Sequence, residues 1–342
     1  MLGAEDRLEN DGKFITELFK KIKVNISPHK VKLVTSGDHY DDYEVRDDKG
    51  RPLKIKISFD KGNAALKKES INLKAAQSSV CGHWLGAADI KLGEEFSYLL
   101  YAFPPSESVR EIGRSTLITE ADTFFECYAR FQQTKSLKKH YKTILKETTE
   151  KFNIKKTLSR EEKGRVDAYT DYKSLESLLI TFKNEAMDLF PTVESSQRAK
   201  CHGEFSLDSI FFNGKNFYFD HLCNNSMGHP FVDFINLILE GGLGRAYEKN
   251  LLPLFCNHTN TQLDKRLYHA LYESLLRKKL VELIGTYIYE VYVFKSYRLN
   301  KILNVADMFS QCYDRFRVIP LFEENREFIL KTLTEPVLGV KA

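Results

Sequence analysis

Residues 201–223 read CHGEFSLDSIFFNGKNFYFDHLC, a polar loop, an apolar run, a tight turn, a second apolar run and another polar loop. The runs 210–212 and 217–219 flank Asn213-Gly214, and both of these residues tolerate the positive φ that tight hairpin turns need. In an antiparallel ladder, residues equally far from the turn lie opposite each other. The sequence therefore predicts a hairpin whose open end brings Glu204 and Asp220 towards one place.

The composition is that of an ordinary soluble globular protein. The chain has 342 residues, 42% of them hydrophobic and 29% charged, enough for two domains or one large bilobal domain. A net charge of +4 is too small to indicate nucleic acid binding. Six cysteines without a C-x-x-C pair indicate reduced thiols. We see no signal peptide and no apolar run of membrane-spanning length, so we expect a cytoplasmic protein without a membrane partner.

The hydrophobic period changes along the chain. Helical spacing predicts helices over 12–24 and 64–76, and nearly everything after residue 117 reads as helix apart from the hairpin. Alternating or β-rich runs predict antiparallel strands at 31–34, 43–45, 53–57 and 96–100. This order of elements predicts an α+β fold with two lobes: a small β-rich N-terminal lobe (1–103) and a larger, mainly helical C-terminal lobe (104–342).

The connection between the predicted lobes is a strand stopped by prolines. The run 96–103 is strand-like, and Pro104-Pro105 ends it because proline cannot donate to a ladder. Junctions between lobes are favoured ligand sites, so we expect a ligand to bind near the end of this strand.

The residues before and after the predicted hairpin resemble the motif of a known superfamily. His202-Gly203-Glu204, then Ser209, a hairpin and Phe219-Asp220 resemble the H-G-D-x-x-x-x-N motif and following apolar-Asp pair of the aminoglycoside phosphotransferase and choline kinase-like superfamily. That superfamily has a protein-kinase-like fold. Downstream, the segment 227–234 resembles the family's Gly, Pro and structural Asp leading into a helix. The resemblance covers residues 31–335 and is strongest over 201–237.

The resemblance implies ATP and Mg²⁺ as cofactors, and a nucleotide and a small hydroxylated molecule as partners. Asp220 would bind the metal, with Ser209 in the place of the second metal ligand. Glu204 would stand in the place of the catalytic base, with His202 beside it in the motif. Phosphoryl transfer needs positioning and charge neutralisation, so acidic groups, a divalent metal and a lysine recur together.

The lysine is expected from the strand 53–57. Alternation puts its three apolar residues on one face and both Lys54 and Lys56 on the other. Lys56 resembles the nucleotide-phosphate lysine and Glu69 its ion-pair partner, while Lys54 points the same way and remains a rival. An edge strand whose lysines discourage aggregation is the plainer interpretation. Four further residues are candidates for nucleotide contacts, two from the loop after the first strand and two from the crossover strand: Ser36, Gly37, Tyr101 and Phe103.

Three departures from the family pattern favour a second hypothesis. The loop 35–43 stands where the family covers the phosphates, yet it holds one glycine and three aspartates, which repel phosphate. Glu204 replaces an Asp, and Ser209 replaces an Asn with a weaker metal ligand. The alternative is a pseudokinase that uses the fold for binding or assembly, with a protein partner.

A zinc site is a minor alternative at the open end of the hairpin. Two cysteines and two histidines lie there in sequence, but without the C-x₂₋₄-C spacing of known zinc modules. They are Cys201, His202, His221 and Cys223.

Overall fold

The structure is a computed structural model that divides into two compact units. It describes residues 4–24, 31–36, 40–47, 49–58, 63–76, 79–92, 94–134, 140–151, 159–168, 170–203, 205–293 and 299–338. Unit 1 contains residues 1–138 and 207–225, and unit 2 contains residues 139–206 and 226–342. The hairpin and the helices after residue 108 pack with one another in unit 1. The lobe boundary expected at residue 103 stays a prediction.

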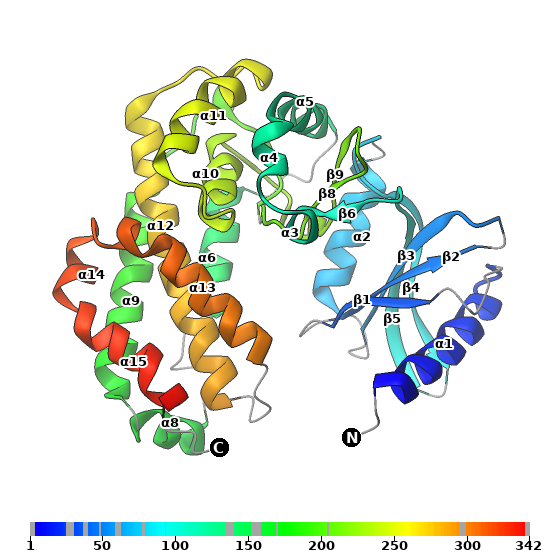
Figure 1. The fold of residues 1–342 in the computed structure, drawn as a ribbon, viewed down its shortest axis with the longest axis horizontal. Helices are drawn as coiled ribbons and strands as arrows, with labels where there is room; N and C mark the ends of the chain where they lie inside the picture. The colour runs from blue at the N-terminus through cyan, green and yellow to red at the C-terminus, as the bar shows by residue number, and fades with distance from the viewer. Residues whose placement is uncertain are drawn as a thin grey trace. The chain divides into compact units, whose positions relative to one another are not determined.

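Unit 1 is built on a five-stranded antiparallel sheet (Figure 1). The strand order is β1-β2-β3-β5-β4, and one helix precedes the sheet while another lies between β3 and β4. These elements are α1 (Ala4–Lys21), β1 (Lys32–Ser36), β2 (Asp41–Arg46), β3 (Pro52–Ser58), α2 (Ala64–Ala76), β4 (His83–Leu92) and β5 (Glu94–Ala102).

The two faces of this sheet differ in chemistry. On one face, apolar side chains of β2, β3 and β5 pack against Ile15, Leu18 and Phe19 of α1, forming a buried core. Because strand residues alternate between faces, Lys54 and Lys56 are directed to the opposite face. Both lysines are nevertheless buried, so that face must supply them with partners.

The rest of unit 1 is the predicted hairpin and its supports. Strands β6 (Glu107–Ser108), β8 (Ile210–Phe212) and β9 (Phe217–Phe219) form a small sheet in the order β6-β8-β9. Gly214 has φ +85°, the conformation that the tight turn requires. Short helices α3 (Val109–Ile112) and α4 (Thr116–Thr119) lead to α5 (Ala121–Gln132), whose Phe124 packs edge-on against Phe217. The turn η3 (Leu222–Asn224) follows the hairpin.

Unit 2 is helical and is organised around one long helix. The helix α12 (Lys265–Ile288) contacts α6, α9, α10 and α13. Its three consecutive cations at 277–279 are buried, and each is ion-paired with a glutamate. The other elements are α6 (Tyr141–Lys151), α8 (Arg160–Asp167), α9 (Tyr172–Leu189), η2 (Ser195–Gln197), β7 (Ala199–Cys201), β10 (Ser226–Gly228), α10 (Phe231–Glu240), α11 (Arg245–His258), the π-helical turn η4 (Tyr289–Val293), α13 (Leu299–Phe316), α14 (Pro320–Glu324) and α15 (Arg326–Leu338).

The predicted α+β fold class is confirmed, with differences in several single elements. The first helix begins at Ala4 rather than at residue 12 and ends at Lys21, just before Lys23 takes φ +61°. The strand β4 was not predicted, because its centre is Gly-Ala-Ala-Asp, residues with weak strand preference. The short pair β7 and β10 was also missed, since three residues carry no period.

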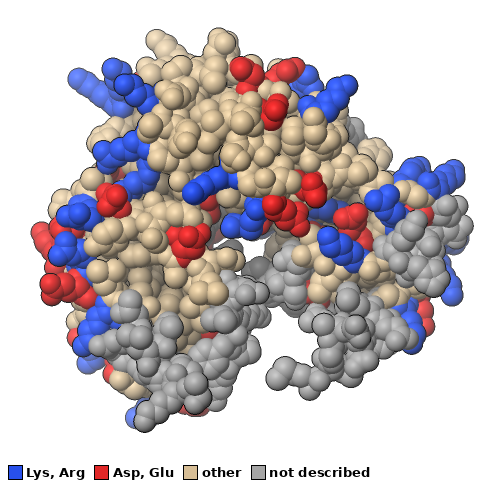
Figure 2. Space-filling model, in the orientation of Figure 1, with Lys and Arg blue, Asp and Glu red and all other residues tan. Residues whose placement is uncertain are grey.

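The surface shows mixed charge. On the face drawn in Figure 2, basic and acidic side chains are interspersed rather than gathered into a field of one sign. Within the described part of the chain, no helix is both long and apolar enough to cross a membrane.

Candidate functional site

The hairpin places Asp220 next to Ser209, as the turn predicts. The backbone N–H of Asp220 donates to the carbonyl of Ser209 at 3.0 Å, directly beyond the last residue pair of β8 and β9. Both residues are buried, with 2% and 1% of their surfaces exposed. The two predicted metal-binding positions therefore lie side by side in unit 1.

Two lysines of β3 reach Asp220 from the charged face of the sheet. Lys54 Nζ donates to Asp220 Oδ2 at 2.9 Å, and Lys56 Nζ donates to Oδ1 at 3.3 Å. Lys56 also donates to Glu69 Oε1 of α2 at 2.6 Å. The phosphate lysine and the helix glutamate expected from the resemblance thus converge on the expected metal acid, and the rival lysine joins them.

The crossover strand β5 and the hairpin complete the surroundings of Lys54. The Tyr101 hydroxyl lies 2.9 Å and 3.0 Å from the two carboxylate oxygens of Asp220. The Lys54 ammonium lies 4.4 Å from the ring centroid of Phe103 and 3.8 Å from that of Phe211. Such contacts are cation–π interactions. Tyr101 and Phe103, expected as nucleotide contacts, therefore already contact the chain's own charged groups.

The charges in this cluster fix one another's ionisation. Burial by itself raises the pKa of Asp220, but the Lys54 and Lys56 ammonium groups outweigh burial and hold that pKa well below its ordinary value. Burial lowers the pKa of Lys56, but Asp220 and Glu69 outweigh it and hold the pKa well above its ordinary value. At neutral pH, Asp220 is therefore a carboxylate and Lys56 an ammonium ion.

Asp42 of β2 belongs to the same cluster, but its carboxylate has no hydrogen-bond partner. It is 1% exposed, and neither of its carboxylate oxygens accepts a hydrogen bond. Burial raises its pKa from 3.8 to about 6, although Lys54 and Lys56 act in the opposite direction. The sequence placed Asp42 in a phosphate-covering loop, whereas it lies in a strand and opposite Lys56.

Replacement of Asp42 by asparagine should therefore stabilise the protein in a pH-dependent way. The folded-state pKa of Asp42 lies above its unfolded value of 3.8, so the free energy of unfolding falls as pH rises from about 4 to about 6. At 1.36 kcal/mol per pKa unit, the loss at pH 7 is about 2–3 kcal/mol. Urea denaturation should show Asp42→Asn to be more stable than wild type by this amount near pH 7 and nearly equal to it near pH 4. An equal difference at both pH values would mean that ionisation of Asp42 is not the cause.

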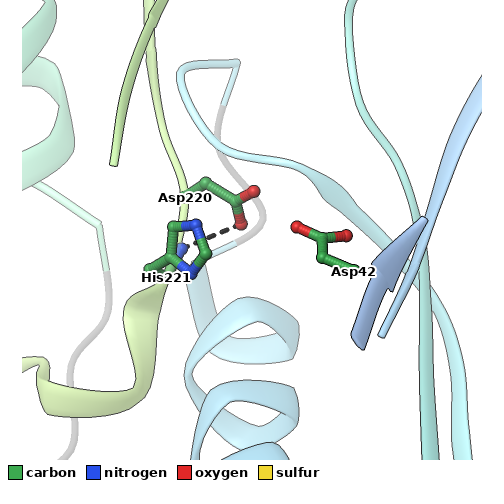
Figure 3. A group of neighbouring side chains, drawn as sticks. All are labelled: Asp42, Asp220 and His221. Atoms are coloured by element: carbon green, nitrogen blue, oxygen red, sulfur yellow. Dashed lines mark hydrogen bonds between the residues drawn. The ribbon is translucent and has the colours of Figure 1, made fainter. Parts of the chain in front are cut away.

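The cluster contains a set of residues that fits a divalent cation. One ligand atom from each of Asp42, Asp220 and His221 lies within 4.8 Å of the others. Figure 3 shows the Asp42 carboxylate directed towards Asp220, while the His221 backbone N–H donates to Asp220 Oδ1 at 2.9 Å. The unpartnered carboxylate is an acceptor for a cation, and the two carboxylates fit the Mg²⁺ that the resemblance implies, because Mg²⁺ prefers oxygen ligands. Cys201 and His202, from the zinc alternative, are not part of this set.

A cavity of about 750 Å³ adjoins the cluster in unit 1. Lys54 and Phe211 line it, so one end of the buried charge cluster faces the cavity. Its other polar walls carry both signs of charge: Lys32, Glu44, Arg46, Glu107 and Glu111. A ligand in this cavity lies next to the ammonium group of Lys54.

The predicted catalytic loop begins in unit 2. The backbone N–H groups of His202 and Gly203 donate to the two carboxylate oxygens of Asp233 at 2.5 Å and 2.9 Å. Asp233 is fully buried in the first turn of α10, where the sequence expected a structural Asp. His202 is also fully buried, and its ring centroid lies 5.2 Å from that of Phe205. Asp233 therefore fixes the backbone just before the predicted base.

Three predicted site residues are not among the contacts described above. Glu204 and Gly37 lie outside the described residues, and Ser36 is the last residue of β1. The roles of these residues stay predictions.

Sequence reasoning did not place Asp42 in this cluster, and it considered His221 only for the zinc alternative. Parity along β2 was a usable signal for Asp42, since a strand that begins two residues earlier than predicted puts Asp42 on one face with Glu44. His221 follows Asp220 directly, and its Nδ1 lies 3.1 Å from the Tyr40 hydroxyl. Its left-handed backbone, with φ +58°, carried no sequence signal.

Solved structures of small-molecule kinases match nearly the whole chain. A spectinomycin phosphotransferase in complex with ADP and spectinomycin has a TM-score of 0.56 at 12% identity, covering 94% of this chain and 97% of that one. An amicoumacin kinase in complex with AMP-PNP and Ca²⁺ has a TM-score of 0.57 at 13% identity, covering 93% and 98%. A choline/ethanolamine kinase family protein from Mesorhizobium loti has a TM-score of 0.53 at 12% identity, covering 89% and 92%.

Sequence comparison adds nothing to these matches, because no protein family and no curated protein matches the chain. The resemblance inferred from residues 201–237 is thus confirmed at the level of fold, and the chain has the protein-kinase-like fold of the aminoglycoside phosphotransferases and choline kinases.

Proposed function

We propose that the chain is a phosphotransferase that transfers the terminal phosphoryl group of ATP to a small hydroxylated molecule. The observation that carries this proposal is the position of Lys56, whose ammonium group is held between Glu69 and Asp220 in a fully buried cluster. A buried lysine held by two carboxylates is fixed in place and remains protonated. Such a group supplies the fixed positive charge that phosphoryl transfer requires of its lysine.

The proposed reaction assigns one task to each group. The acceptor hydroxyl oxygen forms a bond to the terminal phosphorus, the bond from that phosphorus to the ADP oxygen breaks, and the hydroxyl proton goes to Glu204. Lys56 donates to the phosphate oxygens, and Glu69 keeps its ammonium group in position. A divalent cation, held by Asp220, would neutralise phosphate charge. Asp233 holds the backbone before Glu204 and so fixes the start of the base's loop.

A second candidate function is a non-catalytic binding or assembly protein, and the contacts of Lys54 favour it. The Lys54 ammonium occupies Asp220 at 2.9 Å and lies against two aromatic rings beside the cavity. An internal cation in this place takes up both the carboxylate and the aromatic surface that a ligand would use. Under this alternative, the fold would present a surface to a protein partner.

The compartment that we propose is the cytoplasm. The cysteines whose side chains the structure describes are free thiols, and four of these five are buried. Reduced thiols and ATP occur together in that compartment.

Thermal unfolding with ATP, with Mg²⁺ and with both ligands separates the two candidate functions. The enzyme hypothesis predicts a rise in melting temperature of about 5 °C when both are present at roughly 100 times the dissociation constant. Asp220→Asn should lose this rise, because it removes the charge that holds the cation. Asp208→Asn should retain it, since Asp208 is an exposed acid of the same segment that bonds to Arg110. No shift in the wild-type protein at millimolar ATP and Mg²⁺ would favour the non-catalytic candidate.

A further inference from the structure

Asp42 is a buried carboxylate that requires a positive partner. Its side chain comes from β2, is 1% exposed, and has no hydrogen bond to either oxygen. Buried charges in proteins are normally paired or bound to metal, because an unpaired one is costly to desolvate. Asp42 points into the space beside Asp220 (Figure 3). Its geometry indicates a place for a cation between the two carboxylates.

The spacing of the surrounding ligand atoms suits a divalent cation. Atoms bound to one octahedral ion at about 2.1 Å lie roughly 3.0–4.2 Å apart. The candidate atoms of Asp42, Asp220 and His221 all lie within 4.8 Å of one another, so small movements bring them to one ion. Two carboxylates and an imidazole are a ligand set that Mn²⁺ and related divalent ions accept.

The ammonium group of Lys54 now holds the position of that positive charge. It lies 2.9 Å from Asp220 Oδ2, and a metal ion on this oxygen would stand within a few ångströms of the ammonium. Like charges at such a distance repel strongly, so the two cations exclude each other. Lys56 Nζ also lies 3.3 Å from Asp220 Oδ1 and 3.4 Å from His221 Nδ1, so a bound metal ion would displace it from these two atoms. Its shortest bond, at 2.6 Å, runs to Glu69, which keeps the ammonium paired when the longer contacts are lost.

A receiving carboxylate for Lys54 is also present. Glu44 lies directly opposite Lys54 across the β2–β3 ladder, and both residues line the 750 Å³ cavity. Directly opposed residues have Cβ atoms about 4.5–5.5 Å apart, within reach of a lysine that turns towards the cavity. The ammonium can therefore leave Asp220 for a partner on the neighbouring strand.

We propose that Asp42, Asp220 and His221 form a divalent-cation site that Lys54 keeps closed, and that a metal ion enters by displacing the Lys54 ammonium from Asp220. This inference rests on the proposed function in one respect, since the cation bound here is the one that phosphoryl transfer requires. It adds two ligands, Asp42 and His221, and a competing internal cation to the metal position. The site therefore binds a metal ion only when that ion, alone or together with a nucleotide, outcompetes the Lys54 ammonium for Asp220.

Binding of Mn²⁺ alone, followed by the electron paramagnetic resonance signal of the free ion, tests this inference without any activity. Lys54→Met removes the competing cation and should bind Mn²⁺ roughly tenfold tighter than wild type or more. Asp42→Asn should bind it roughly 10- to 100-fold more weakly, both alone and in the Lys54→Met background. Asp42→Asn is isosteric and relieves an unpaired buried charge, so lost binding cannot come from unfolding. Lys54→Gln provides a second variant should methionine fail to fold.

Two matched controls are available on the same elements. Asp41→Asn makes the same change one residue earlier, on the other face of β2, and should leave Mn²⁺ affinity unchanged. Lys32→Met removes a different lysine of the cavity wall and should also leave it unchanged.

Three results would overturn the inference: unchanged Mn²⁺ affinity in Asp42→Asn, unchanged affinity in Lys54→Met, or no Mn²⁺ binding by either wild type or Lys54→Met at millimolar concentration. Its failure is distinguishable from failure of the proposed function. If the protein phosphorylates a substrate from ATP and the Asp42→Asn variant does so equally well, the proposed enzyme function is supported and the proposed metal site is contradicted. If Mn²⁺ binding depends on Asp42 and Lys54 but no nucleotide binds, the proposed metal site is supported and the proposed enzyme function is contradicted.

Discussion

Replacement of Lys56 by methionine is expected to lower the free energy of unfolding by about 3–5 kcal/mol. The side chain is completely buried, and its ammonium group is bonded to Glu69 and Asp220. Methionine keeps the length and the apolar stem but removes the charge, so three buried carboxylates remain with Lys54 alone. The loss is large because breaking a buried ion pair leaves an uncompensated charge. Urea denaturation near pH 7 measures it.

The pattern across variants identifies the cause of this loss. Lys54→Met should cost less, because Asp220 keeps Lys56 and Tyr101 as partners. Lys67→Met, at an exposed position on α2, should cost almost nothing. Adding Glu69→Gln to Lys56→Met should restore part of the stability by removing one of the stranded carboxylates. A loss below about 1 kcal/mol for Lys56→Met would mean that the cluster is not held together by its charges.

Replacement of Glu204 by glutamine is expected to lower the rate of phosphoryl transfer by roughly 10² to 10⁴, the usual contribution of a positioned base. Glutamine keeps the size of glutamate but cannot take the acceptor's proton. Nucleotide binding should be unchanged, because the phosphate-binding and metal-binding groups that we propose are on β2, β3 and the residues that follow the hairpin. Single-turnover transfer from ATP measures the rate, and the melting temperature with ATP and Mg²⁺ checks the binding.

Glu204→Asp and Glu194→Gln accompany this measurement. Aspartate, the residue of the family motif, is one methylene shorter and draws the carboxylate back by roughly an ångström. A displacement of this size can change a rate about a hundredfold. Glu194→Gln makes the same chemical change at an exposed position of the same unit and should leave the rate unchanged. Equal turnover in wild type and Glu204→Gln would remove Glu204 from the role of base.

Elements with a local chemical cause were predictable from the sequence. The Asn-Gly turn and its flanking apolar runs predicted the bounds of β8 and β9, and the helical period of residues 64–76 predicted the bounds of α2. The strand β4 was not predictable in this way, since its Gly and Ala residues form a strand only because nine of its residues pair with β5. Tertiary pairing decided that segment against its local preference.

In the candidate site, too, the residues placed by local sequence patterns were predictable, and those placed by tertiary packing were not. Alternation in β3 put Lys54 and Lys56 on one face, and the hairpin delivered Asp220. The choice between the two lysines could not be made, because it depends on the distance between strands far apart in the sequence, and both bond to Asp220. Asp42 was assigned to a loop because its strand begins with two aspartates, and its burial depends on partners that only the folded sheet supplies.

The interleaving of the two units along the chain has a consequence for synthesis. Lys54 and its partner Asp220 are 166 residues apart, so a ribosome adding about 5–20 residues per second makes the lysine roughly 10–30 s before its counter-charge. During that interval Lys54 lacks its counter-charge, and Lys56 has Glu69 but not Asp220 as a partner. The N-terminal part therefore cannot complete its charged face as it emerges, and must wait for the hairpin. Stalling the ribosome before residue 207 should yield a nascent chain whose sheet is more sensitive to protease than one stalled well after residue 225.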